Sequence, residues 1–349
     1  MNGTRCYLDW NASAPLRPEA RAALIGALDV TGNPSSVHAE GRAARALVER
    51  ARGQLAAALG AEGADIVFTS GATEAAALAL AGRDLVGAGI EHDAVAAWID
   101  PILPCDGEGR VTVPDPAQAT LQIANSETGV VQVLPEGLAV SDLTQGFGKL
   151  PIAFNWLGCE MGFVSAHKIG GPKGVGALVL RRGLDLAAQI KGGGQEMGRR
   201  AGTENVAAIA GFGAAAEAAA RDLAHGAWAE VEEIRNILGC ALEAVAPETI
   251  LVGKGAARLP NTLCLVTPGW KGETQVMQMD LAGFAVSSGS ACSSGKVRES
   301  RVLRAMGLEA RAAGSALRVS LGPGVTKEDV LRFADAWERQ LKRFRARAA

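Results

Sequence analysis

Short apolar runs alternate with alanine-rich stretches along most of this 349-residue chain. The runs have the length of strands but not the polar alternation of a half-exposed sheet. They therefore predict strands buried on both faces, as in a parallel sheet covered by helices. They lie at 66–69, 121–124, 138–141, 162–165 and 177–180. Their alternation with helical stretches is typical of an α/β fold.

The stretches between these runs predict helices over 38–59, 73–80 and 205–245. The last stretch is too long for one uninterrupted helix, and we expect a break near Gly226. Aromatic residues make up only 4% of the chain, so Ala, Leu, Val and Ile must build the core. That composition suits helices packed on a buried sheet.

The pattern changes from about Pro247 to that of a smaller α+β unit. Strands are predicted at 262–266 and 316–320, and a helix ends the chain. Thr326 and Asp329 have the spacing of a capping box at its start. We therefore expect two domains, a large one over 1–246 and a small C-terminal one over 247–349.

Charge and hydropathy exclude several classes of protein. The 35 Lys and Arg nearly balance the 37 Asp and Glu, which argues against binding to nucleic acid or a membrane surface. No apolar run is long enough to span a membrane, and the N-terminus lacks the apolar core of a signal peptide. We expect a cytoplasmic protein.

The cysteines form no CxxC pair, so neither a disulfide framework nor a zinc site is expected, and no other metal site is predicted. The six are Cys6, Cys105, Cys159, Cys240, Cys264 and Cys292. Cys292 differs from the others because small polar residues surround it over 287–295. Buried structural cysteines usually have apolar neighbours, so we expect Cys292 to be exposed.

Two polar clusters follow predicted strands. The segment 69–74 joins a strand, a glycine turn and a helix start, which places free N–H groups and the positive end of a helix dipole at one point. That arrangement suits phosphate, although an ordinary helix cap explains the same residues. Lys168 follows the run at 162–165, where desolvation would lower its pKa and prepare it for Schiff-base chemistry. A surface-turn lysine is the alternative.

Asp142 and Gln145 come at the end of another predicted strand, at 138–141. The carboxyl edge of a parallel sheet faces the usual ligand crevice. A carboxylate there could keep the ring nitrogen of pyridoxal 5'-phosphate (PLP) protonated. A turn or helix cap is the alternative use of such an aspartate.

Taken in order along the chain, these clusters resemble the NifS/IscS-type cysteine desulfurases. That family is PLP-dependent, belongs to the class-V aminotransferases and has the aspartate-aminotransferase fold, known as fold type I. The resemblance covers nearly the whole chain. The motifs that carry it lie at 7–12, 32–38, 67–74, 91–95, 165–168, 192–196, 200–205 and 288–292.

The resemblance implies a role for each matching residue. Lys168 matches the Schiff-base lysine, Asp142 the partner of the ring nitrogen, Gln145 a donor to the ring oxygen, and His92 the imidazole stacked on the ring. Thr203 matches a residue that reaches the cofactor phosphate of the neighbouring subunit, which implies a homodimer. The residues that match the phosphate-binding cup are Ala72, Thr73, Ser165 and His167.

The remaining matches concern the substrate. Arg318 matches the arginine that grips the substrate carboxylate, a task suited to a planar bidentate donor. Asn125 is a second candidate for substrate binding. Cys292 matches the nucleophile that accepts sulfur. The resemblance therefore implies conversion of L-cysteine to L-alanine, with a persulfide on Cys292 passed to an acceptor protein for iron–sulfur cluster assembly.

Two alternatives remain open at this point. The chain could be a related PLP-dependent lyase or aminotransferase that does not use Cys292 covalently. It could also be a degenerate scaffold subunit of a sulfur-transfer complex. The second alternative rests on departures from the family pattern.

One departure is Ser126, which stands where the family has an asparagine in contact with the cofactor ring oxygen. We expect that contact to be lost, to pass through water or to be taken over by Asn125. Another departure is length, because the segments 105–121 and 125–137 are short for helical crossovers. We expect peripheral helices to be replaced by loops there, and the region 82–90 to be trimmed. The cysteines other than Cys292 are expected to be structural.

Overall fold

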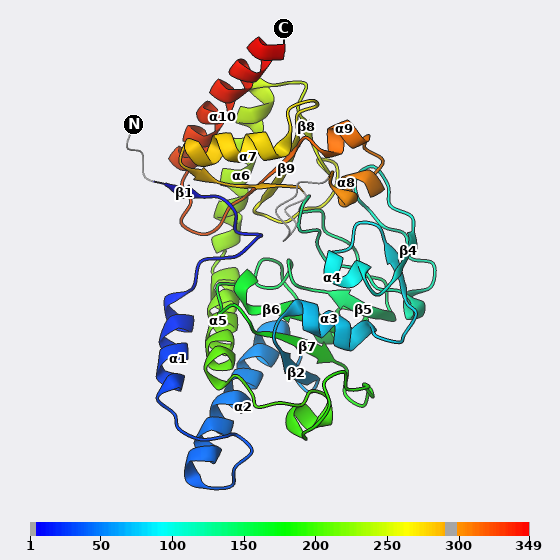
Figure 1. Ribbon diagram of the computed structural model, residues 1–349, viewed down its shortest axis with the longest axis vertical. Coiled ribbons are helices and arrows are strands. Elements are labelled where there is room, and N and C mark those ends of the chain that lie inside the picture. The colour runs from blue at the N-terminus through cyan, green and yellow to red at the C-terminus, as the bar shows by residue number, and fades with distance from the viewer. Residues whose placement is uncertain (1–4, 290–298, 349) are drawn as a thin grey trace.

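The protein is described here by a computed structural model that covers residues 5–289 and 299–348. Figure 1 shows a larger unit below and a smaller unit above, joined by the long helical region at 206–245. No helix within the described part of the chain has the length and hydropathy needed to cross a membrane.

The larger unit is built on a sheet of four strands in the order β2-β7-β6-β5. These are β2 (Asp65–Thr69), β7 (Gly176–Leu180), β6 (Cys159–Ser165) and β5 (Leu138–Asp142). β5 and β6 are parallel, and β7 runs antiparallel to both of its neighbours. Parallel bridges continue the sheet from β5 through 119–120 to β3 (Val86–Ala88) and β4 (Asp100–Leu103).

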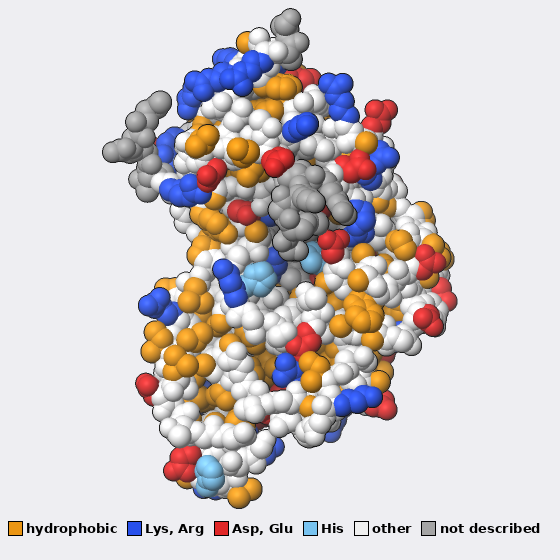
Figure 2. Space-filling model, in the orientation of Figure 1, with side chains coloured by type: hydrophobic (Ala, Val, Ile, Leu, Met, Phe, Trp, Pro, Cys, Tyr) orange, Lys and Arg blue, Asp and Glu red, His pale blue; other side chains and the backbone are white. Residues whose placement is uncertain are grey.

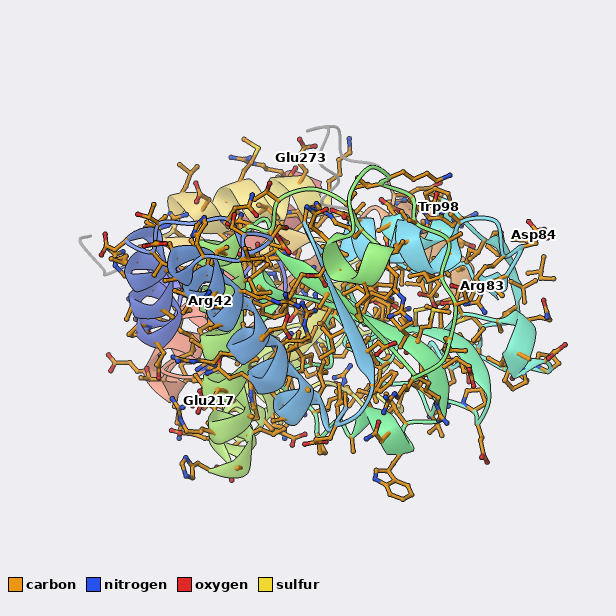
Figure 3. The ribbon with its side chains drawn as sticks, turned by 90° about the horizontal axis from the view of Figure 1, so that it is seen from below. Arg42, Arg83, Asp84, Trp98, Glu217 and Glu273 are labelled. Carbon is orange, nitrogen blue, oxygen red and sulfur yellow. The ribbon has the colours of Figure 1, made fainter. Side chains whose placement is uncertain are left out.

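Helices cover both faces of this sheet, which explains why its strands are apolar throughout. α1 (Pro18–Leu28), α2 (Ala39–Leu59) and α5 (Val206–Ala224) pack together on one side. α3 (Ala72–Leu80) packs on the other, with α4 (Asp93–Ala96) beside it. Figure 3, seen from below, shows α2 and α5 with Arg42 and Glu217 on one side, and Arg83, Asp84 and Trp98 at the opposite edge.

The smaller unit has an antiparallel sheet in the order β11-β12-β9-β8. Its strands are β11 (Ser287–Ser288), β12 (Ala316–Ser320), β9 (Thr262–Val266) and β8 (Ile250–Leu251). Its helices are α6 (Ala227–Val245), α7 (Gly272–Leu281), α8 (Arg301–Ala305), α9 (Ala310–Ala313) and α10 (Lys327–Ala348). A short β1 (Cys6–Tyr7) pairs with β10 (Phe284–Ala285), which brings the N-terminal segment onto this unit.

Most of the predicted elements are confirmed. The long helical stretch breaks where Gly226 adopts a left-handed conformation (φ 75°), between α5 and α6. Thr326 and Asp329 form the capping box, since the Asp329 N–H donates to Thr326 Oγ1 over 3.2 Å and the Thr326 N–H donates to Asp329 Oδ2 over 3.1 Å. The mainly parallel α/β sheet is also as expected.

The run at 121–124 differs from its prediction. It forms no regular strand. Isolated bridges join Thr120 to Val140 and Ala124 to Val131, and the N–H groups of Leu121 and Ile123 donate to carbonyls of β5 over 3.2 and 2.9 Å. The chain turns back immediately after it, and that reversal prevents a longer ladder. The short crossovers are as expected, because within 105–121 and 125–137 the only helix is the 3-10 turn Pro116–Gln118.

Candidate active site

A cavity of about 500 Å³ opens where β5 and β6 end and α3 begins. Figure 2 shows histidine and basic side chains gathered in the hollow between the two units. The structure brings together here nearly all of the residues that the resemblance assigns to the cofactor. Those that line the cavity are Ala72, Thr73, His92, Ser126, Asp142, Gln145, Ser165, His167 and Lys168.

One end of the cavity is suited to an anion. α3 begins at Gly71 without a side-chain cap, so the first N–H groups of the helix stay available, and Ser165 and His167 come from the end of β6 beside them. Gly176 allows this close approach, because a Cβ there would lie 2.7 Å from the Gly71 backbone. Burial, with Lys168 and Lys173 nearby, lowers the pKa of His167 to about 4.

Lys168 lies in the 3-10 turn that follows β6. Its Nζ donates to the carbonyl oxygens of Asn11 (2.7 Å) and Ala12 (3.0 Å). Burial and the charge of Arg318 lower its pKa to about 8, and Asp142 and Asp9 oppose the change. Such a lysine is partly unprotonated near neutral pH and can act as a nucleophile or a base.

Asp142 ends β5 and accepts a hydrogen bond from the Thr144 N–H over 2.8 Å. Burial raises its pKa, so a cation beside it would be needed to keep it ionised. The Thr144 hydroxyl, which also lines the cavity, is buried and has no hydrogen-bond partner within the described part of the chain. His92 caps α4 through Nδ1, which accepts from the Ala94 N–H over 3.1 Å, and it lines the cavity as well.

These residues fit the cofactor that the resemblance implies. The uncapped helix start suits a phosphate, the buried carboxyl suits a protonated ring nitrogen, and the partly unprotonated amine suits an aldehyde. The unpartnered Thr144 hydroxyl is a further polar group that a ligand could satisfy.

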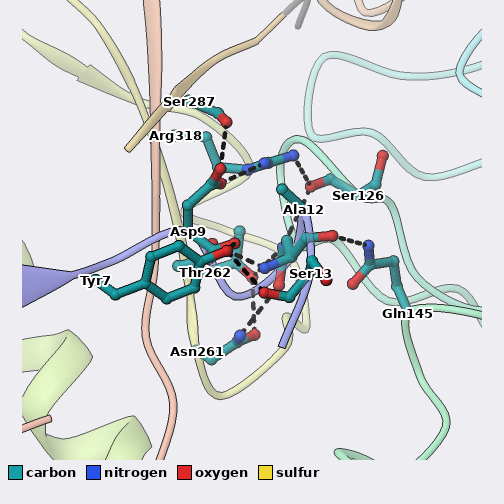
Figure 4. A network of polar contacts seen from close by, with 12 residues as sticks. Tyr7, Asp9, Ala12, Ser13, Ser126, Gln145, Asn261, Thr262, Ser287 and Arg318 are labelled. Atoms are coloured by element: carbon teal, nitrogen blue, oxygen red, sulfur yellow. Dashed lines mark hydrogen bonds and ion pairs between the residues drawn. The ribbon is translucent and has the colours of Figure 1, made fainter. Parts of the chain in front are cut away.

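A second cavity, of about 460 Å³, adjoins the first and shares His92, Ser126 and Lys168 with it. Arg318, from β12, lines this second cavity. As Figure 4 shows, its guanidinium is held by Asp9 Oδ1 (2.7 Å) and the Ser126 carbonyl (3.1 Å). Its Nε is buried and has no partner among the described residues, which leaves a donor for a carboxylate.

Asn125 and Ser126 differ in their position relative to the two cavities. The Asn125 side chain accepts from the N–H groups of Glu127 and Thr128 (both 2.9 Å) and donates to the Ile90 carbonyl (3.0 Å). It is therefore occupied in shaping the turn and is not among the residues that line the two cavities, whereas Ser126 lines both.

Besides Arg318 and Asn125, two further assigned residues are not part of the main cavity. Thr203 is exposed and lines a separate cavity of about 160 Å³ beside Ser70. Cys292 lies outside the described residues, although Gly289, three positions before it, lines the second cavity. Of the other cysteines, Cys6, Cys159 and Cys264 are buried and Cys240 is exposed.

Three titratable groups around the site were not predicted from the sequence, and of these Glu91 and Lys149 are buried and Glu127 is half-buried. Glu91 and Glu127 line the second cavity, and burial raises their pKa values to about 8 and about 7. Lys149 lies behind Gln145, its Nζ donating to Gln145 Oε1 over 2.7 Å. Glu91 lies in the motif at 91–95, whereas nothing in the sequence indicates that Lys149 is buried.

Comparison with known proteins agrees with this geometry. The family model for Aminotransferase class-V matches residues 6–98 and 113–333. A cysteine desulfurase of Cereibacter sphaeroides is 39% identical over 95% of this chain and 94% of its own length. The cysteine desulfurase IscS of Dictyoglomus turgidum is 35% identical over 97% of this chain and 95% of its own.

Solved structures with the same fold include a NifS-like protein. A NifS-like protein from Rickettsia africae superposes with a TM-score of 0.89, covers 97% of this chain and 99% of its own, and shares 32% identity. From its sequence, its fold and its cavity, the chain belongs to the class-V aminotransferase family, in which its curated relatives are named cysteine desulfurases.

Proposed function

We propose that this protein is a PLP-dependent cysteine desulfurase that converts L-cysteine to L-alanine. Its sulfur passes to Cys292 as a persulfide and then to an acceptor protein, for iron–sulfur cluster assembly. The observation that carries the proposal is the single cavity that gathers the anion-binding helix start, Asp142 and Lys168. The identity with named cysteine desulfurases supports the same activity.

The cofactor would be held at three points. The N–H groups of Ala72 and Thr73, with Ser165 and His167, would bind its phosphate, and Asp142 would pair with its ring nitrogen. Lys168 would bond its aldehyde carbon. When bound, PLP supplies an electron sink for charge that develops at the substrate Cα.

The chain's own groups then bind the substrate and move its proton. Arg318 would receive the carboxylate of L-cysteine, since no described residue pairs with its buried Nε while Asp9 and Ser126 hold the rest of the guanidinium. Lys168 Nζ would take the Cα proton, a task suited to an amine with a pKa of about 8.

Sulfur transfer needs the thiolate of Cys292. Its Sγ would attack the sulfur of the substrate and form an S–S bond while the substrate C–S bond breaks. The electron pair of that C–S bond stays with the carbon fragment, which takes up protons and leaves as L-alanine. The terminal sulfur then moves to a thiol of the acceptor, and the thiolate of Cys292 is regenerated.

We also propose a cytoplasmic homodimer in which Thr203 serves the cavity of the partner subunit. Thr203 is exposed and lies outside the main cavity of its own chain, which is what a residue acting across an interface requires. Arg200, close to it in sequence, pairs with Glu74 over 2.8 Å at the start of α3.

Mass analysis of Cys292 after incubation with L-cysteine tests the activity, and one added sulfur atom is expected. The variant Cys292→Ser should lose sulfide release but keep the visible absorbance of bound PLP. Full turnover in that variant would favour a lyase or aminotransferase that does not use the thiol. A protein that stays colourless after PLP is added would favour a scaffold.

A further inference from the structure

Lys149 is a fully buried lysine to which the proposed mechanism gives no task. It follows β5 and is 3% exposed. Its two hydrogen-bond partners are amide oxygens, Gln145 Oε1 at 2.7 Å and Asn11 Oδ1 at 3.3 Å. Burial lowers its pKa well below the ordinary value, and the charges of Lys168 and Arg318 lower it further.

The hydrogen bonds of Lys149 fix which way the Gln145 amide faces. The amide Nε2 donates to the Asn11 carbonyl over 2.9 Å, an interaction drawn in Figure 4. If the amide were turned over, its oxygen would face that carbonyl and its N–H2 group would face the amine. Two oxygens would then face each other at Asn11, and the donation from Lys149 to Gln145 Oε1 would be lost, so the observed orientation is favoured.

The same network reaches the amine of Lys168. The Asn11 carbonyl that accepts from Gln145 also accepts from Lys168 Nζ. The Asn11 side chain accepts from Lys149 and from Asn261 (3.0 Å) and donates to Thr262 (2.8 Å) in the smaller unit. Lys149 therefore donates hydrogen bonds to the side chains of Gln145 and Asn11. Gln145 in turn donates to the Asn11 carbonyl, which also accepts from Lys168.

We propose that Lys149 is a positioning residue for the cofactor cavity. Its amine holds the Gln145 amide, which lines the cavity, in the orientation that donates to the Asn11 carbonyl, and it holds Asn11 so that this carbonyl stays beside Lys168. This inference rests on the proposed cofactor. Lys149 itself does not touch the cavity, so its effect must pass through Gln145 and Asn11.

The test measures the affinity of the apoprotein for PLP from the visible absorbance of the bound cofactor. The variants are Lys149→Met, which keeps the length but loses the donors, Gln145→Leu, and the two combined. Each single variant should bind PLP roughly tenfold more weakly, as expected for one lost hydrogen bond in a buried site. The loss of affinity in the double variant should be smaller than the product of the two single losses, because both changes remove the Lys149–Gln145 interaction.

Lys342→Met is the matched control, because Lys342 is exposed and pairs with Glu338 on its own helix. Its PLP affinity should equal that of the unchanged protein. The thermal unfolding midpoint of each apoprotein separates loss of positioning from loss of the fold. Should Lys149→Met not fold, Lys149→Gln retains an N–H2 group and should give a smaller loss of affinity.

Three results would overturn the inference. Lys149→Met could bind PLP as tightly as the unchanged protein, or the losses of affinity in the double variant could multiply. Alternatively, neither Lys149→Met nor Lys149→Gln could fold, in which case Lys149 is a structural residue.

Failure of the proposed function gives different results. Unchanged protein that binds PLP but forms no alanine from L-cysteine contradicts the desulfurase proposal and leaves the comparison of affinities valid. Protein that binds no PLP contradicts both.

Discussion

Lys168 illustrates how position alone changes the chemistry of a side chain. An exposed lysine stays charged far above neutral pH, whereas burial and the nearby Arg318 lower the pKa of this one to about 8. No carboxylate lies within hydrogen-bond distance of its Nζ among the described residues, since its partners are two backbone carbonyls. The free amine therefore becomes available as the pH rises towards 8.

This pKa predicts a pH dependence for cofactor capture. The rate at which the apoprotein binds PLP should rise with pH, with a midpoint near 8, because only the unprotonated amine attacks an aldehyde. Arg318→Gln removes a positive charge that lowers the pKa of Lys168, so the midpoint should move to higher pH. Capture at pH 7 should then be up to roughly tenfold slower, since each pKa unit changes the free amine tenfold.

Stopped-flow absorbance over pH 6–10 measures this rate. Arg304→Gln is the control, because Arg304 is exposed on α8 and lies outside both cavities. A midpoint that stays in place in Arg318→Gln would contradict the electrostatic account of Lys168.

At the scale of single elements, α10 depends on the capping box that begins it. Thr326 is exposed, so Thr326→Ala removes the hydroxyl that accepts from the Asp329 N–H without leaving a cavity. The free energy of unfolding should fall by about 1 kcal/mol, the usual cost of losing such a cap. Urea denaturation measures it, and Thr326→Ser, which keeps the hydroxyl, should unfold close to the unchanged protein. Equal losses in both variants would mean that the methyl group, not the cap, matters.

The elements could be predicted where local pattern and burial agree. The runs that became β5, β6 and β7 are apolar because helices cover both faces of the sheet. The run at 121–124 is also mostly apolar but forms no regular strand, and Asn125 turns the chain back directly after it. That turn depends on side-chain contacts that periodicity does not record.

The division into units also depends on packing rather than on pattern. Trp228 and Leu238 of α6 lie in the core of the smaller unit with Trp270 and Trp337, although α6 continues the helical stretch of α5 in sequence. Leu8 of the N-terminal segment joins the same core. We therefore propose that the smaller unit begins at α6 and includes this segment.

The candidate site could also be predicted only in part from the sequence. Lys168, Asp142 and the start of α3 could be placed together from sequence, because the ends of neighbouring strands meet at one sheet edge. The partners of these residues could not, since Asp9 and Asn11 reach the site from the N-terminal segment through contacts with β12 and β9. Lys149 became notable only once its burial was known.

At the scale of the whole molecule, the position of Thr203 predicts that one chain cannot complete its own site. If Thr203 serves the partner's cofactor phosphate, Thr203→Val should weaken PLP binding in every site of a homodimer, by roughly tenfold for one hydrogen bond to an anion. Lys168→Ala should abolish covalent capture. Each variant alone therefore has only defective sites.

Mixing the two variants under conditions that exchange subunits gives a sharp result. In a mixed dimer, one site has Lys168 from the Thr203→Val chain and Thr203 from the Lys168→Ala chain, so it is complete. With random pairing in a two-fold dimer, about a quarter of all sites should regain full PLP affinity. If Thr203 acted within its own chain, every site would carry a defect and none would recover. Recovery on mixing is therefore expected only when the partner subunit completes the cavity.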